Sequence, residues 1–361
     1  MLAPMDLESA AARLLTVGFH GKALTPELER LLARGVGGVI LFARNVGSPA
    51  EVLELTRALK RKAARPLLVS IDQEGGKVAR LRDGFTPLPA FRALGELGDA
   101  TLARAYGRVV GTELAAVGVD LDFAPVLDVD TNPENPVIGV RSLGSDPALV
   151  AMLGVAFAAG LGDAGVAACG KHFPGHGDTR TDSHHELPRL THPLSRLEQV
   201  ELVPFAAAAA AGIPAIMTAH VVFEALDPER PATMSAAVLH ALLRERLGYS
   251  GVVFSDDLEM QAIADHYAID SVMVEGLTAG VDSFLACHTA ELAHRAIDAV
   301  VSGVTRGVLT PDRVHAAAGR IQALAERFAV REAEELGLAV VGSEAHRALV
   351  RRLTPGARGA A

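Results

Sequence analysis

Residues 251–260 read GVVFSDDLEM, a short apolar run that ends in two adjacent carboxylates. Such a run predicts a buried strand, and the acidic residues directly after it predict functional groups held by a rigid element. Further apolar runs rich in Val, Ile and Leu recur along the chain. Together they predict eight strands, at residues 14–19, 36–42, 67–71, 119–123, 166–170, 215–218, 251–255 and 281–285.

Longer stretches with helical apolar spacing separate these runs, an alternation typical of βα units around a parallel sheet. The predicted helices include residues 49–63, 101–117, 147–164, 195–211 and 235–247, and a closing helix at 311–328. Eight such units favour an α/β fold, a (β/α)8 TIM-like barrel in a single domain. We expect the barrel domain to span residues 1–330, and residues 331–361 to form a short C-terminal extension, a linker-like helix and a frayed tail.

The competing architecture is an open doubly wound sheet, which normally has a glycine fingerprint after its first strand. Here polar clusters follow many of the predicted strands instead. The sequences at the strand exits are FHG, FARN, IDQEGG, FAPVLDVDTN, GKHFPGHGD, TAHVVF, FSDDLE and ACHT. In a barrel the carboxyl ends of all strands form one rim, which is where the active site lies. Any single exit could be explained by turn residues alone, but the whole set favours a shared site.

Composition narrows the class of ligand. The 361 residues contain 34 Lys and Arg against 43 Asp and Glu, a net charge of -9, and no basic tract. This balance argues against nucleic acid or an anionic membrane surface as a partner. Trp is absent and aromatic residues make up 4%, which leaves few stacking platforms for long sugar chains. We therefore expect a small ligand in a pocket.

Two features indicate the cellular setting. Cys169 and Cys287 lie within apolar runs, where a thiol usually behaves as a small core residue, so we predict both to be free and buried. The first residues, MLAPMDLESAAARLL, show neither a basic region followed by an apolar stretch nor a cleavage site. These observations predict a cytoplasmic protein.

The densest group of reactive side chains is residues 171–186, KHFPGHGDTRTDSHHE. In one interpretation Asp182 and His184 form a proton-transfer dyad, in which the carboxylate fixes the imidazole tautomer. In the other, histidines of this segment are ligands of a hydrolytic metal site. The histidines of that alternative are His172, His176, His184 and His185. For His176 and His185 we favour a third role, bracing the loop by hydrogen bonds.

The acidic pair at residues 256 and 257 and the cluster at residues 70–80 supply the other candidates. Successive side chains of a strand point to opposite faces, so we do not expect Asp256 and Asp257 to share one target. We assign chemistry to Asp256 and helix capping to Asp257. In SIDQEGGKVAR, Asp72 and Arg80 suit the edge of a sugar ring, since a carboxylate accepts two hydroxyls and a guanidinium donates in a fork. Arg141 is the residue after the fourth strand that we expect to reach a ligand.

The sequence also resembles a known family. The segments IDQEGGKVARL, FAPVLDV, NPVIGVRSLGSDP, KHFPGHGDTRTDSHHELP, MTAHVVF and GVVFSDDLEM are similar, in this order, to the motifs of family-three glycoside hydrolases. The similarity covers roughly residues 10 to 330. More narrowly, these segments resemble the β-N-acetylglucosaminidase branch of bacterial cell-wall recycling.

The resemblance implies a role for each matched residue. Asp256 would be the catalytic nucleophile of a retaining exo-glycosidase, and the Asp182–His184 pair its acid/base. A neutral imidazole also avoids a second anion beside the nucleophile. Five residues would hold a terminal N-acetylglucosamine: Asp72, Arg80, Arg141, Lys171 and His172.

The implied activity is hydrolysis of terminal β-linked N-acetylglucosamine from muropeptide fragments. We expect no cofactor, no metal and a monomer or homodimer. Four alternatives stay open: a phosphorylase using the same residues, attack by the substrate's own acetamido group, a metal-dependent amidohydrolase on a barrel, and a sugar-binding module without catalysis.

Overall fold

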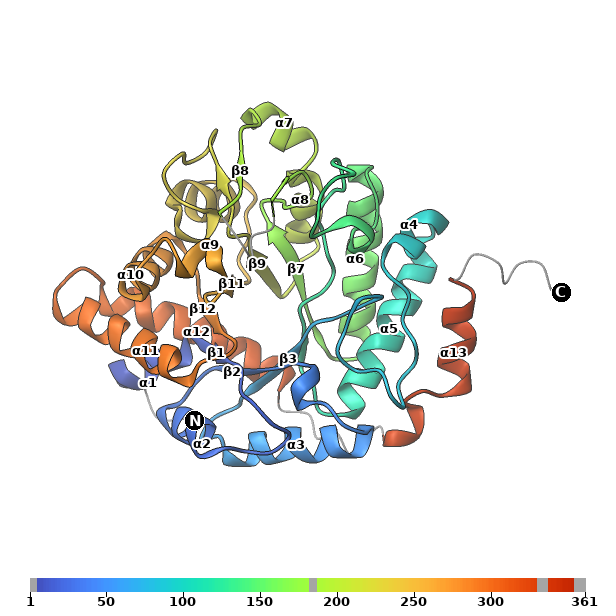
Figure 1. The fold of residues 1–361 in the computed structure, drawn as a ribbon, viewed down its shortest axis with the longest axis horizontal. Coiled ribbons are helices and arrows are strands. Elements are labelled where there is room, and N and C mark those ends of the chain that lie inside the picture. The colour runs from blue at the N-terminus through green and yellow to red at the C-terminus, as the bar shows by residue number, and fades with distance from the viewer. Residues whose placement is uncertain (1–4, 182–186, 330–336, 354–361) are drawn as a thin grey trace.

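The computed structural model describes residues 5–181, 187–329 and 337–353. Among these residues, eight parallel strands close into a barrel in the order β1, β2, β3, β6, β7, β9, β11 and β12, and β12 pairs with β1 (Figure 1). Their bounds are β1 (Leu15–Val17), β2 (Gly38–Leu41), β3 (Leu68–Ile71), β6 (Leu121–Asp122), β7 (Ala167–Phe173), β9 (Ala215–Thr218), β11 (Val252–Asp257) and β12 (Ser283–Ala286). The predicted eight strands and the barrel are confirmed, and the open sheet is wrong.

Helices surround the barrel on its outside (Figure 1). In chain order they are α1 (Leu7–Arg13), α2 (Pro26–Arg34), α3 (Pro49–Lys62), α4 (Arg92–Leu97), α5 (Ala100–Ala116), α6 (Pro147–Asp163), α7 (Leu194–Gln199), α8 (Leu202–Ala210), a π-helix (Ala237–Arg246), α9 (Gln261–Ala264), α10 (Ile269–Ala279), α11 (Ala290–Thr305), α12 (Pro311–Phe328) and α13 (Glu344–Arg351). Their starts follow local rules: Ser48 and Glu51 form a capping box on α3, and Asp146 caps α6 ahead of a proline.

One predicted helix is two helices. The segment predicted as a single helix at residues 195–211 forms α7 and α8, and the chain leaves helical geometry at Val200. Pro204 explains the break, because a proline ring clashes with the carbonyl four residues earlier, which here belongs to Val200. The predicted helix at residues 235–247 is present as the π-helix.

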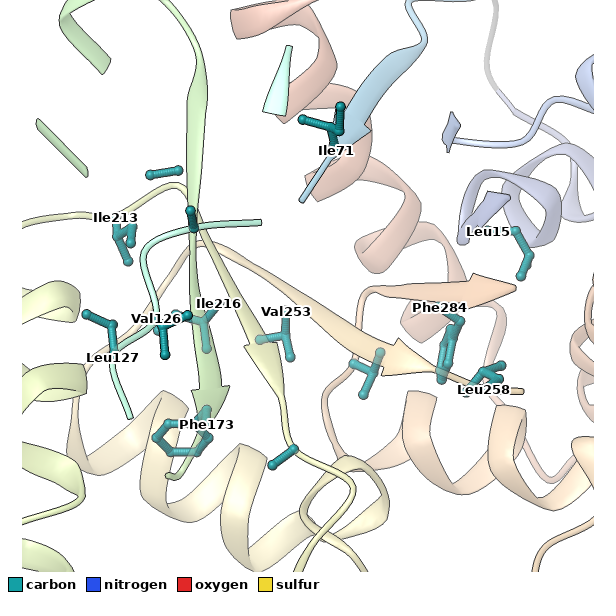
Figure 2. Packing of buried hydrophobic residues seen from close by; sticks show 14 of the residues in the cluster. Leu15, Ile71, Val126, Leu127, Phe173, Ile213, Ile216, Val253, Leu258 and Phe284 are labelled. Atoms are coloured by element: carbon teal, nitrogen blue, oxygen red, sulfur yellow. The ribbon is translucent and has the colours of Figure 1, made fainter. Parts of the chain in front are cut away.

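The core has two layers separated by the strands. Val252 and Phe254 on β11 belong to the layer inside the barrel, whereas Val253 between them belongs to the layer under the helices. This alternation is the period of two expected of a strand. Figure 2 shows part of the outer layer, including Ile71, Val253 and Phe284.

Helix α12 closes the amino end of the barrel. Its residues Ile321, Leu324 and Phe328 pack with the inner layer, and Phe328 lines a cavity with Pro214, which precedes β9. The opposite, carboxyl end of the barrel is therefore the end left for a site. Cys169 and Cys287 are free and buried, as predicted. No helix in the described ranges is long and apolar enough to span a membrane.

Two small sheets extend the strand exits. The antiparallel hairpin of β4 (Gln73–Gly75) and β5 (Val78–Ala79) follows β3, and β8 (Arg189–Leu190) pairs with β10 (Val222–Phe223). The hairpin turn requires glycine: Gly75 has φ 103°, and a Cβ there would lie 2.2 Å from the Pro89 carbonyl oxygen. The hairpin carries Glu74 and leads directly to Arg80.

Candidate functional site

Side chains from the strand exits meet in one cavity of about 240 Å³ at the carboxyl end of the barrel. The polar residues that line it come from the ends of β3, β7, β11 and β12 or the residues just after them, from the end of the β4–β5 hairpin and from the loop after β6. They are Asp72, Arg80, Arg141, Lys171, His172, His176, Asp256, Asp257 and His288. The apolar lining includes Phe42, Met217 and Leu285. A concave site with a few convergent polar groups is the common form of a small-molecule site.

Asp256 lies near the end of β11. Its Oδ1 accepts a hydrogen bond of 2.8 Å from the backbone N–H of Asp257. Burial alone would raise the pKa of the Asp256 carboxyl, but His172, His220, the N–H of Asp257 and the ammonium of Lys171 together hold the pKa below its ordinary value. The carboxylate is therefore ionised near neutral pH, as a nucleophile requires.

Asp257 does not cap the following helix, so the capping role expected from the sequence is wrong. Helix α9 starts after Met260, without a side-chain cap. The Asp257 carboxylate instead accepts from the N–H groups of Glu259 and Cys287, at 3.2 and 3.3 Å. Both Asp256 and Asp257 line the cavity, because the register between β11 and β12 shifts between Phe254 and Asp257, and a bulge breaks the alternation of faces.

A buried charge network forms one wall of the cavity. Lys171, 2% exposed, lies 2.7 Å from a carboxylate oxygen of Asp72 and 2.7 Å from one of Glu74. Arg141 donates to both oxygens of Glu74, at 2.8 and 2.7 Å, and Arg80 lies 3.3 Å from Asp72. Bidentate pairs of this kind fix the direction of the remaining donors.

The same network sets the protonation of its members. Burial would raise the pKa of Glu74, but Arg141 and Lys171 hold it well below its ordinary value. Burial would likewise lower the pKa of Lys171, but the carboxylates of Asp72 and Glu74 raise it. Both side chains stay charged near neutral pH, so the wall presents fixed ammonium, guanidinium and carboxylate groups that suit sugar hydroxyls.

Asp128 orients the two histidines on β7 and after it. Its Oδ2 lies 2.7 Å from Nδ1 of His172, and its Oδ1 accepts from the backbone N–H groups of His172 and His176. Because a carboxylate only accepts, Nδ1 of His172 carries a hydrogen, which leaves Nε2 for a ligand. His176 is braced by Thr179 at 2.7 Å, and burial lowers the pKa of His176 to about 4, so it stays neutral. The predicted bracing role of His176 is confirmed.

The structure brings together the sequence-predicted residues that it describes. Around this cavity lie Asp72, Arg80, Arg141, Lys171, His172 and Asp256. Asp182, His184 and His185 lie outside the described residues. Within the described ranges, no three His, Cys, Asp or Glu side chains form a group able to hold a metal ion.

Several residues of the site lie in no local motif that predicts their role. Glu74 lies within the predicted cluster at residues 70–80, but its pairing with Arg141 joins residues 67 positions apart. His288 was visible only as part of the exit ACHT, and His220 as part of TAHVVF. For all three residues, the indication in the sequence is their position at a strand exit. None of them lies in a local motif that predicts which residue it contacts.

Comparisons with known proteins agree with this geometry. The profile of the glycosyl hydrolase family 3 N-terminal domain matches residues 7–324. A β-hexosaminidase of Bordetella parapertussis is 44% identical over 290 residues, which are 78% of this chain and 82% of that protein. Another β-hexosaminidase, from Alkalilimnicola ehrlichii, is 43% identical over 307 residues, covering 83% of this chain and 85% of the relative.

Solved structures show the same fold. A glycoside hydrolase family 3 β-N-acetylglucosaminidase from Paenibacillus sp. superposes with a TM-score of 0.92 at 43% identity, over 97% of this chain and 68% of that one. NagZ from Neisseria gonorrhoeae, in complex with N-trifluoroacetyl-D-glucosamine, has a TM-score of 0.81 at 35% identity, over 94% and 96% of the two chains. With a family profile across most of its length and relatives above 40% identity, this chain belongs to glycosyl hydrolase family 3 and is a glycoside hydrolase.

Proposed function

We propose that this chain is a β-hexosaminidase that removes non-reducing terminal β-linked N-acetylglucosamine by a retaining mechanism. The observation that carries the proposal is the placement of the Asp256 carboxylate in the same cavity as the wall of Lys171, Asp72 and Arg80. The names of the relatives support the activity, and the N-trifluoroacetyl-D-glucosamine bound by the gonococcal protein supports the sugar.

In the proposed first step, an oxygen of Asp256 attacks the anomeric carbon. The bond to the leaving oxygen breaks as His184, oriented by Asp182, donates a proton to that oxygen. In the second step His184 removes a proton from water, the water oxygen bonds to the anomeric carbon, and Asp256 leaves as a carboxylate. The roles of Asp182 and His184 rest on the motif resemblance, since both residues lie outside the described ranges.

The charge network is the proposed sugar-binding wall. Asp72 accepts from ring hydroxyls, while Lys171, Arg80 and Arg141 donate to them, and His172 offers Nε2. Because these groups are already paired with one another, they are oriented before the sugar arrives, and less ordering entropy opposes binding. A concave cavity of about 240 Å³ at one end of the barrel suits a single terminal sugar better than an internal stretch of a sugar chain.

The setting proposed for this activity follows the same resemblance. We propose muropeptide fragments of peptidoglycan recycling as substrates, a cytoplasmic location, a monomer or homodimer, and a catalytic domain at residues 1–330. The motif KHFPGHGDTRTDSHHELP supports this branch of the family.

The decisive variant is Asp256→Asn, with p-nitrophenyl N-acetylglucosaminide as substrate. We expect turnover to fall by at least about a thousandfold, because the amide cannot form the glycosyl-enzyme. A fluorosugar inactivator should leave a mass adduct on Asp256 in the unaltered enzyme. Asp312→Asn, an exposed carboxylate at the start of α12, is the matched control and should keep full activity.

Two results would overturn the proposal. Unchanged turnover by Asp256→Asn would show that this carboxylate is not the nucleophile. An enzyme that turns over but never forms the adduct would instead favour attack by the substrate's acetamido group. Product analysis with and without phosphate separates hydrolysis from a phosphorylase, since only the latter yields a sugar phosphate.

A further inference from the structure

The bulged end of β11 controls which oxygen of Asp256 is available. The N–H of Asp257 donates to Oδ1 of Asp256 at 2.8 Å. This bond uses one lone pair of Oδ1, and among the described residues no hydrogen bond is given to Oδ2, which is therefore the less engaged oxygen. The direction of the nucleophile therefore depends on the orientation of the peptide group between the two aspartates.

Regular strand pairing does not hold this peptide group, because the register with β12 shifts between Phe254 and Asp257. Asp257, which supplies the N–H of this peptide group, is held instead through its carbonyl and its side chain. The Asp257 carbonyl oxygen lies 3.0 Å from Nε2 of His220. The Asp257 Oδ1 accepts from the N–H groups of Glu259 and Cys287. Through these two hydrogen bonds, the side chain of Asp257 connects the bulge to the turn after β11 and to the residue that follows β12.

The second carboxylate oxygen of Asp257 faces His288. Its Oδ2 lies 3.4 Å from Nε2 of His288, and Nδ1 of the same ring lies 3.3 Å from Nη1 of Arg44. A guanidinium only donates, so Nδ1 accepts and Nε2 carries the hydrogen that points to Asp257. The Asp257 carboxylate raises the pKa of His288, and Nε2 keeps its hydrogen in either protonation state.

Arg44 and Phe42 hold the His288 ring in this orientation. Nε of Arg44 donates to the Phe19 carbonyl at 2.8 Å, and its Nη2 donates to the Cys287 carbonyl. The ring of His288 stacks on Phe42, with centroids 5.6 Å apart and planes 30° apart. The series of contacts from Arg44 through His288 to Asp257 is therefore held by backbone carbonyls at Arg44, and at Asp257 it reaches the nucleophile Asp256.

We propose that His288 and Asp257 are positioning residues for Asp256. They hold the β11 bulge so that the Asp257 N–H engages Oδ1 and Oδ2 is presented to the anomeric carbon. This inference rests on the proposed role of Asp256 as nucleophile. Both residues also line the cavity, so direct contact with the substrate is the competing explanation that the experiment must separate.

Three variants test this series of contacts. His288→Phe keeps a ring over Phe42 but removes both nitrogens, and His288→Gln restores a donor toward Asp257. Asp257→Asn keeps an oxygen for the two backbone N–H groups, but its NH2 group then faces the Nε2–H of His288, so two donors face each other. His240→Gln, an exposed position on the π-helix, is the matched control. Circular dichroism melting of each variant establishes that it is folded.

The readout is formation of the glycosyl-enzyme on Asp256 by the fluorosugar inactivator. We expect His288→Phe and Asp257→Asn to lower the maximal inactivation rate by about ten- to a hundredfold, with half-saturation unchanged, because misplacing a reacting atom slows the chemical step. His288→Gln should recover most of the rate. Dinitrophenyl and p-nitrophenyl glycosides should lose kcat/KM equally, since nucleophile position does not depend on leaving-group protonation.

An unchanged inactivation rate in His288→Phe and Asp257→Asn would overturn the inference. So would weaker half-saturation at an unchanged maximal rate, which would show direct substrate contact, or a loss confined to the poorer leaving group, which would show a role in proton transfer. If the unaltered enzyme forms no adduct on Asp256, the proposed function itself has failed, and this result is distinct from the other three.

Discussion

Asp122 at the end of β6 is a carboxyl group that forms no ion pair among the described residues. It is fully buried, its Oδ1 accepts from the Gln73 N–H at 2.9 Å, and its Oδ2 has no hydrogen-bond partner among the described residues. Burial raises the pKa of Asp122 from its ordinary value of 3.8 to about 8. Asp122 is therefore protonated near neutral pH, and it supports Gln73 at the start of the hairpin that carries Glu74.

The pH dependence of stability tests this state. Between the unfolded and folded pKa values the folded chain holds a proton that the unfolded chain lacks, so the free energy of unfolding falls as the pH rises. We expect Asp122→Asn to remove this slope. The free energy of unfolding, measured with urea, should change in favour of the variant relative to the unaltered protein by up to about 4 kcal/mol between pH 5 and pH 8. Parallel pH curves for variant and unaltered protein would contradict the protonated state.

At the scale of elements, α5 and α6 approach so closely that glycine is required between them. A Cβ on Gly160 would lie 2.1 Å from the Arg104 carbonyl oxygen, and one on Gly107 would lie 2.2 Å from that of Phe157. Helix α6 leads into β7, which carries Lys171 and His172. The helix contact therefore fixes the position of the strand that supplies two site residues.

Two alanine substitutions in α6 should have opposite effects. Gly160→Ala should lower the free energy of unfolding by about 1–3 kcal/mol, because the helices must separate to admit the methyl group. Gly162 is exposed, and nothing lies within 4 Å of the position that its Cβ would take. Gly162→Ala should therefore raise the free energy of unfolding by about 0.5–1 kcal/mol, because alanine has the higher helix propensity. Urea unfolding measures both, and equal effects would show that the helix contact does not require glycine.

At the scale of the whole molecule, the C-terminal segment packs on the barrel domain through the buried side chains of Val350 and Leu353 and through one carboxylate. Glu113 on α5 accepts from the Gly342 N–H at 2.9 Å and lies 2.8 Å from Nδ1 of His346 on α13. The same side chain accepts from both the N–H and the hydroxyl of Thr86. Glu113 thus joins α13 to the loop after Arg80, while barrel closure itself depends on β1 and β12.

His346→Ala should loosen this segment and leave the barrel intact. We expect a loss of about 1 kcal/mol in local stability, because one hydrogen bond to a charged group disappears. Limited proteolysis with intact-mass detection should then cut faster within residues 338–353, at an unchanged unfolding midpoint. His240→Ala is the control. A lower midpoint without faster cleavage would mean that α13 stabilises the barrel as one cooperative unit.

Much of the secondary structure can be predicted from local sequence patterns. The apolar runs named all eight strands, and the closing helix at residues 311–328 matches α12 residue for residue, because its proline start and apolar spacing are local features. Apolar spacing continues across Val200 and predicts one helix at residues 195–211, but the clash of Pro204 with the carbonyl of Val200 divides it into α7 and α8. The bulge that aims Asp256 and Asp257 into one cavity has no sequence marker.

The sequence by itself determined the strand and helix alternation, the family motifs and the residue types at the strand exits, because each depends on neighbours a few positions away. Only the tertiary structure decided the partners: Lys171 with Asp72 across 99 positions, Arg141 with Glu74 across 67, and His172 with Asp128 across 44. Barrel closure brings these side chains together in a buried site. There the cost of leaving a charge unpaired selects one arrangement, which no local pattern contains.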